Sequence, residues 1–252
     1  SLTMADTEKN QKKYPQPKSQ AKGCGFPQAR IVCGFSLSTG AVLDAAFSPL
    51  SAGEVTLFRQ LYGNLETNDV ALGDRMFGSY ADICLLREDG VDSAFRVHGA
   101  RKTDFRKGKR LARWDHIVEW VKPKQCPPGL STKLFGQLPE TILLRETRFY
   151  ITKKGFRTED VTLVTTLLDS KRYTRVDLAE LYRLRWQAEI DFKHLKTTMQ
   201  MEHLPSRTPE MVRKDFYVHL LAYNLIRTVQ LQANREHQVA PLALSFQATI
   251  QH

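Results

Sequence analysis

The chain has 252 residues, 42% of them hydrophobic, and a formal net charge of +10. The length and composition are typical of a globular protein with one large domain or two small ones. A positive surplus of this size suggests a polyanionic partner, nucleic acid first, although ribosomal and membrane-surface proteins can be equally basic.

No run of 18 apolar residues occurs, which excludes a membrane span, and the N-terminus lacks the apolar core of a signal peptide. The four cysteines form no C-x-x-C pair and no zinc-like spacing with histidines, so reduced thiols in a cytosol are expected. Met4 lies inside the chain and no polar tail closes it, so we expect the interior of a longer protein.

The first hundred residues alternate between predicted strands and helices. A polar stretch rich in Lys, Gln and Pro predicts a loop at 8–28. Predicted strands cover 29–38, 41–49, 69–77 and 92–100, with a hairpin signal at Thr39-Gly40 and Asp74 at the end of the third strand. Predicted helices cover 51–65, with Ser51 as the cap, and 79–89, closed by Gly90. This order predicts an α/β fold with a mixed sheet and at least one parallel crossover.

The pattern changes after residue 100. Residues 101–113 carry seven Lys or Arg and one Asp, and they are either a solvated loop or an arm that contacts phosphates. Residues 141–168 alternate and are rich in Thr, Val and Ile, as strands are. We therefore predict a β-rich insertion over 101–168, followed by helices at about 176–201 and 209–236.

The first of these helices carries a cationic stripe. At about 100° of rotation per residue, one side of the helix collects six residues: Tyr182, Arg185, Trp186, Glu189, Lys193 and Lys196. Apolar residues from Leu181 to Met199 form an adjacent stripe that is expected to be buried. The simplest interpretation is a solvated face with i,i+4 ion pairs, each worth about 0.2–0.5 kcal/mol.

Two features favour a function for the stripe. It holds one anion for three cations, and it includes two large aromatic side chains. A cationic stripe with aromatics suits a nucleic-acid backbone with an unstacked base, for which Trp186 is the stacking candidate. A lone carboxylate, Glu189, suits a metal ion that a phosphate also contacts.

The spacing Tyr182-x2-Arg185-x3-Glu189-x6-Lys196 resembles the Tyr-Arg-Glu-Lys signature of bacterial insertion-sequence transposases, in particular the insertion-sequence-four family. The segment "NDVALGDRMFGSYADICLL" resembles the second-aspartate motif of these enzymes, and residues 4–49 resemble their region after the first aspartate. The resemblance covers nearly the whole chain and implies a ribonuclease-H-like catalytic domain interrupted by a β-rich insertion.

The resemblance implies a catalytic Asp-Asp-Glu triad, with Asp74 as the second Asp and Glu189 as the Glu. The first Asp is expected just upstream of residues 1–3, with Asp6 as the alternative within the chain. By resemblance, Asp74 and Glu189 hold Mg²⁺ (or Mn²⁺), while Tyr182, Arg185, Trp186, Lys193 and Lys196 bind DNA. Without its upstream Asp, the 252-residue chain is expected to cleave DNA poorly.

The implied activity is cleavage at transposon ends followed by transfer of the 3′-hydroxyl into target DNA. The implied partners are double-stranded DNA and a second copy of the chain, in the bacterial cytoplasm near the nucleoid. Two alternatives stay open: a truncated or domesticated relative that binds DNA without cutting it, and an unrelated basic nuclease of similar shape. For Asp74 alone, the simpler alternative is a cap on the helix that follows.

Overall fold

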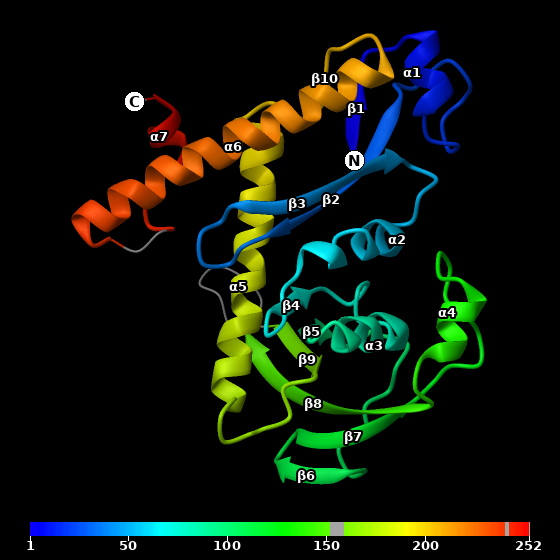
Figure 1. Ribbon diagram of the computed structural model, residues 1–252, viewed down its shortest axis with the longest axis vertical. Helices are drawn as coiled ribbons and strands as arrows, with labels where there is room; N and C mark the ends of the chain where they lie inside the picture. The colour runs from blue at the N-terminus through cyan, green and yellow to red at the C-terminus, as the bar shows by residue number, and fades with distance from the viewer. Residues whose placement is uncertain (152–158, 240–241, 252) are drawn as a thin grey trace. The chain divides into compact units, whose positions relative to one another are not determined.

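The computed structural model describes residues 1–151, 159–239 and 242–251. Two compact units make up the chain. The first unit combines Ser1–Leu61 with Trp186–His252, and the second unit is Tyr62–Arg185. Each unit has a mixed sheet of its own with helices beside it (Figure 1), so the α/β fold class is confirmed. The expectation that the first four predicted strands share one sheet is wrong, because they divide between the two sheets.

The first unit is built on a four-stranded sheet with the order β10-β1-β2-β3. Its strands are β1 Leu2–Met4, β2 Gln28–Phe35, β3 Val42–Pro49 and β10 His203–Leu204. β2 and β3 form the predicted hairpin, and Gly40 in its loop has φ +70°, which favours glycine. β1 pairs antiparallel with β2 and parallel with β10, so segments 200 residues apart lie side by side.

The helices of this unit are α1 Glu8–Lys13, α2 Glu54–Arg59, α6 Pro209–His237, α7 Phe246–Gln251 and the end of α5 Arg175–Lys193. α6 starts at the predicted proline with Thr208 as its cap. Two expectations are wrong. The stretch 8–28 contains α1, capped by Thr7, and α2 begins at Glu54 after Gly53 rather than at Ser51. Apolar residues of α6 pack with those of the sheet into one buried core.

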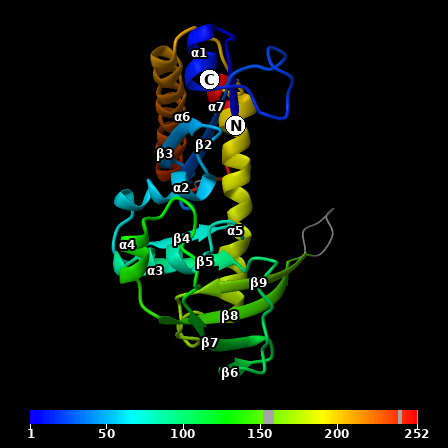
Figure 2. The same cartoon turned by 90° about the vertical axis from the view of Figure 1, so that its right-hand side faces the viewer.

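The second unit is built on a six-stranded sheet with the order β4-β5-β9-β8-β7-β6 (Figure 2). Its strands are β4 Val70–Gly73, β5 Asp92–Arg96, β6 Lys109–Ala112, β7 Asp115–Val121, β8 Thr141–Ile151 and β9 Glu159–Thr165, with the helices α3 Tyr80–Glu88 and α4 Thr132–Gln137. β4 and β5 are parallel and joined through α3, which Ser79 caps and Gly90 (φ +76°) follows, as predicted.

The strands expected in the insertion extend this same sheet. β9 pairs antiparallel with β5, and β8, β7 and β6 follow in order. The 101–168 boundaries of the insertion stay a prediction. Within the described residues, no helix is both long and apolar enough for a membrane span, and all four cysteines are free.

Charged side chains are buried between β7 and β8. The Arg145 guanidinium donates to both carboxylate oxygens of Asp115, at 2.8 and 2.6 Å, and to the Tyr173 carbonyl at 2.6 Å. Beside it, the buried Glu146 carboxylate accepts from Trp120 Nε1 at 2.8 Å and lies 3.1 Å from His116 Nε2. A bidentate pair of this kind fixes the register of the two strands through side chains as well as backbone.

A second buried ion pair ties α5 to α6 in the first unit. The side chains of Asp191 and Arg227 are 1% and 3% exposed, and Arg227 Nη2 donates to Asp191 Oδ1. Gln187 Nε2 donates to the same carboxylate oxygen at 3.0 Å, and Arg227 also donates to Tyr223 and Gln230. Burial raises the pKa of the Asp191 carboxyl, whereas the Gln187 hydrogen bond and the Arg227 charge act in the opposite direction. Desolvation is thus the larger effect, as it often is for a charge removed from water.

We predict that Arg227→Met destabilises the chain by about 3–5 kcal/mol, because it leaves the Asp191 carboxylate buried without its counter-charge. Urea unfolding measures the free energy of unfolding. Glu210→Ala is the control, because it breaks only the exposed pair with Lys214 on the same helix, and should cost at most about 0.5 kcal/mol. An equal loss of unfolding free energy in the two variants would show that the buried pair contributes no more than an exposed one.

Candidate active site

Asp74 follows directly after β4, as expected from the sequence. Its carboxylate is half-buried, and Oδ1 accepts from the Met76 backbone N–H at 2.7 Å. The helix that follows is capped by Ser79, whose hydroxyl accepts from the Asp82 N–H. Asp74 is therefore not the helix cap that the simpler interpretation required. It holds a turn at the carboxyl end of a strand that belongs to a parallel pair, where α/β sheets place ligands.

Glu189 lies on α5, three residues inside the first unit, and its side chain is exposed. Asp74 belongs to the second unit. That the Asp74 and Glu189 carboxylates lie close enough to share metal ions stays a prediction. The buried Asp191 is two residues further along the same helix, and its pair with Arg227 fixes the rotation of α5 about its axis. That rotation decides the direction in which Glu189 points from this unit.

The five predicted DNA-binding residues differ in their surroundings. Tyr182 is 3% exposed, and its ring centroid is 6.3 Å from that of Phe149. The Arg185 guanidinium lies 5.5 Å from the Tyr182 ring. Trp186 is half-buried and Lys193 is exposed. Lys196 is half-buried, with its ammonium 5.0 Å from the Phe192 ring.

The expected separation of a charged stripe and a buried apolar stripe is therefore only partly right. Tyr182, assigned to the charged stripe, is buried, whereas Leu184, assigned to the apolar stripe, is 40% exposed. Packing against β8 decides the position of Tyr182, and a helical wheel contains no information about β8. The roles of the five residues in DNA binding stay predictions.

A π-helical turn, His194–Thr198, follows α5 and contains Lys196. Sequence reasoning missed it. A π turn has i→i+5 hydrogen bonds, and such turns occur frequently at functional sites. Because one extra residue enters the turn, Lys196 lies at a different angle from Glu189 than an uninterrupted α-helix would give. Burial, together with the charges of Arg227 and Lys193, lowers the pKa of His194, whose ring stacks on Phe246 at 4.5 Å.

Asp6, the alternative first aspartate, follows β1 and is exposed. Its Oδ1 accepts from Gln11 Nε2 at 2.8 Å, and the neighbouring Thr7 caps α1. Among the described residues, no group of three or more His, Cys, Asp or Glu is close enough to hold a metal ion. Asp74 and Glu189 nevertheless supply carboxylate oxygens, the ligands that a hard cation such as Mg²⁺ prefers.

The basic run 101–113 is not one structural element. Its first residues form a loop after β5, and its last residues enter β6. Arg101, Lys102 and Thr103 line a pocket together with Arg75, Arg96 and Arg148, which come from three other segments. No local pattern in the sequence predicts this grouping, because it depends on which strands pair.

Comparisons with known proteins agree with the resemblance seen in the sequence. Residues 2–225 match the family described as the transposase DDE domain. The chain is 26% identical over 227 residues to the transposase InsG for insertion sequence element IS4 of Escherichia coli (strain K12). That match covers 88% of this chain and 48% of the relative, so the chain spans about half of that protein's length.

A second relative matches a shorter segment. The putative transposase InsL for insertion sequence element IS186A of Escherichia coli (strain K12) is 38% identical over 64 residues, which is 25% of this chain and 17% of the relative. The family match covers most of the chain and includes both Asp74 and Glu189. The chain therefore belongs to the transposase DDE domain family.

Proposed function

We propose that this chain is the catalytic part of an insertion-sequence transposase, which cleaves phosphodiesters at transposon ends and joins the 3′-hydroxyl to target DNA. The observation that carries the proposal is the placement of the two motif carboxylates. Asp74 directly follows a strand of a parallel pair, and Glu189 lies on the helix that carries the Tyr-Arg-Glu-Lys spacing. The family match over residues 2–225 supports the same activity.

Asp74 and Glu189 are the residues that would hold divalent metal, Mg²⁺ or Mn²⁺. Domains of this family generally use divalent metals, which when bound activate the attacking oxygen and stabilise the leaving oxygen of a phosphodiester. Asp74 is prepared for this role, because its hydrogen bond to the Met76 N–H orients the carboxylate.

The basic side chains of α5 and the π turn would bind the DNA. The Arg185 guanidinium can form two parallel hydrogen bonds with one phosphate, whereas Lys193 and Lys196 offer point charges. Trp186 would stack on an unpaired base. Tyr182 would reach a phosphate only through its hydroxyl, because its ring is packed against Phe149. We further propose that two copies act together on two transposon ends in the bacterial cytoplasm.

We predict that Glu189→Gln and Asp74→Asn each lower strand cleavage by about a thousandfold or more, because each removes a metal-holding charge. The assay incubates the protein with a matched transposon-end duplex and Mg²⁺ or Mn²⁺. DNA affinity in the absence of metal should stay within about twofold of the unchanged protein, which separates catalysis from binding.

Glu180→Gln is the matched control, because Glu180 is an exposed glutamate on the same helix. The assay is run on the 252-residue chain and on a version extended upstream, each with and without Asp6→Ala. Cleavage that depends on Asp6 would identify it as the first aspartate. Full cleavage by Glu189→Gln would contradict the proposal, and DNA binding without cleavage in every version would favour the non-cutting relative.

We also predict that DNA affinity falls steeply with salt, because each neutralised phosphate releases counterions with a slope of about −0.9 in log K against log salt. Lys193→Ala should make this slope less steep by the contribution of about one phosphate. Lys9→Ala, at an exposed lysine of α1, is the control and should leave it unchanged. Fluorescence anisotropy with a labelled duplex between about 50 and 200 mM salt measures the slope. An affinity that is flat over this range would rule out binding through phosphates.

A further inference from the structure

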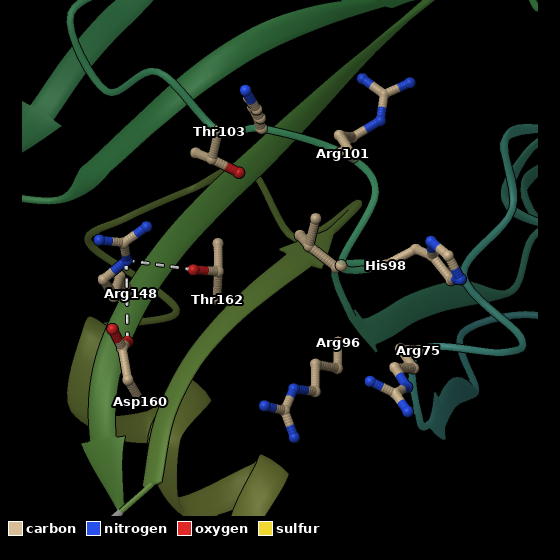
Figure 3. Close-up of a pocket in the computed structure, with 11 residues that line it drawn as sticks. Arg75, Arg96, His98, Arg101, Thr103, Arg148, Asp160 and Thr162 are labelled. Carbon is tan, nitrogen blue, oxygen red and sulfur yellow. Dashed lines mark hydrogen bonds and ion pairs between the residues drawn. The ribbon is translucent and has the colours of Figure 1, made fainter.

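The second unit contains an open pocket of about 480 Å³, here named the basic pocket, beside the carboxyl end of β5 (Figure 3). Its walls come from the turn after β4, the end of β5 with the loop that follows, and the facing strands β8 and β9. Its described lining residues are Arg75, Arg96, Val97, His98, Gly99, Arg101, Lys102, Thr103, Arg148, Asp160 and Thr162.

Positive charge dominates this lining. Five of the described lining residues are Arg or Lys, and Asp160 is the one carboxylate among them. That carboxylate forms a partly exposed ion pair with Arg148, at 3.7 Å from its Nε, and so offsets at most one of the five charges. Like charges gathered in one concave site repel one another unless an anion enters. The chemistry of the pocket therefore selects an anionic ligand.

Two of the arginines are held in position by the protein. Arg148 Nε donates to Thr162 Oγ1 at 3.2 Å on the opposite strand (Figure 3). The Arg101 guanidinium lies 3.5 Å from the centre of the Trp120 ring, and the Trp120 N–H is itself bound by the buried Glu146. Because these side chains are fixed in advance, a ligand that binds them loses less conformational entropy.

An unsatisfied hydroxyl lies in the same wall. The Thr103 Oγ1 atom is buried and has no hydrogen-bond partner among the described residues. A buried hydroxyl without a partner costs about 1–3 kcal/mol. Because this atom is closed to solvent, the Thr103 side chain must rotate before an anionic oxygen in the pocket can accept its hydrogen bond and remove that cost. The charge of the lining therefore carries the argument for an anionic ligand.

We propose that the basic pocket binds a phosphodiester group of a DNA strand, at a site distinct from Asp74 and Glu189. The proposal rests on the proposed function, since the partner is the DNA on which the protein acts. The pocket is open and its described lining has no Phe, Tyr or Trp, so it suits a backbone that passes through better than an enclosed nucleotide.

The pocket adjoins the candidate catalytic aspartate along the chain. Arg75 directly follows Asp74 in the chain. The Asp74 carboxylate accepts a hydrogen bond from the backbone N–H of Met76, on the other side of Arg75. A strand whose phosphate is held by Arg75 is thereby tied to the turn that presents Asp74. The pocket thus fixes the position of the DNA within the second unit, independently of the residues on α5.

Two kinds of variant test the proposal: one removes positive charge from the pocket, and the other removes its negative charge. Arg75→Ala combined with Lys102→Ala removes two exposed cations and should weaken DNA binding at least tenfold at about 100 mM salt. The plot of log K against log salt should become less steep by the contribution of about two phosphates. Asp160→Asn removes the carboxylate and should tighten binding by about threefold. The measurement is anisotropy with a labelled duplex on the full chain, and circular dichroism verifies that each variant is folded.

Matched controls change the same charge elsewhere. Lys12→Ala combined with Lys13→Ala removes two exposed cations from α1, and Glu88→Gln removes one exposed carboxylate from α3. Pocket variants that behave like these controls overturn the inference. If the unchanged chain does not bind DNA at all, the proposed function fails as well. Calorimetry with inorganic phosphate is the third arm, and tight phosphate binding without any loss of DNA affinity in the pocket variant would assign a small-anion site instead.

Discussion

The buried pair of Asp191 and Arg227 is the interaction on which the first unit depends. It joins α5 to α6, and through the Tyr223 hydroxyl, which donates to the Gly40 carbonyl at 2.7 Å, it reaches the β2–β3 hairpin. A side chain on Gly40 would come within 3.0 Å of the Arg227 guanidinium, so the loop itself is shaped to the pair. A buried ion pair adds little net stability over apolar packing, but its geometry admits few alternatives. Here that geometry sets the orientation of the helix that carries Glu189.

The second unit uses the same device for another purpose. Arg145 and Asp115 lock β8 against β7, and Glu146 holds Trp120 beneath Arg101. The buried Glu146 carboxylate thus supports one wall of the basic pocket. Each unit thereby combines one candidate catalytic carboxylate with its own group of basic side chains: Glu189 with Lys193 and Lys196, and Asp74 with Arg75 and the pocket.

Local signals in the sequence predicted local structure well. Ser79 and Gly90 bound α3, Pro209 starts α6, and Asp74 directly follows its strand, because each depends on backbone preferences within a few residues. The division into two sheets was missed, since it depends on long-range pairing such as that of β5 with β9, in which Phe95 pairs with Val164. The π turn was missed because no residue type marks it. The candidate carboxylates were found through motif spacing, whereas the residues of the basic pocket come from segments that only the sheet brings together.

The parallel pairing of β1 with β10 has a consequence for the order of folding. Thr3 is in register with His203, so β1 leaves the ribosome two hundred residues before its parallel partner β10. The intervening second unit, Tyr62–Arg185, can complete its sheet during this time. Closing so long a loop is slow, because the chain loses conformational entropy before the β1–β10 hydrogen bonds can form. In the nascent protein, the second unit is therefore folded while the edge of β1 that will pair with β10 is still unpaired. Misassembly between neighbouring chains would begin at this exposed edge.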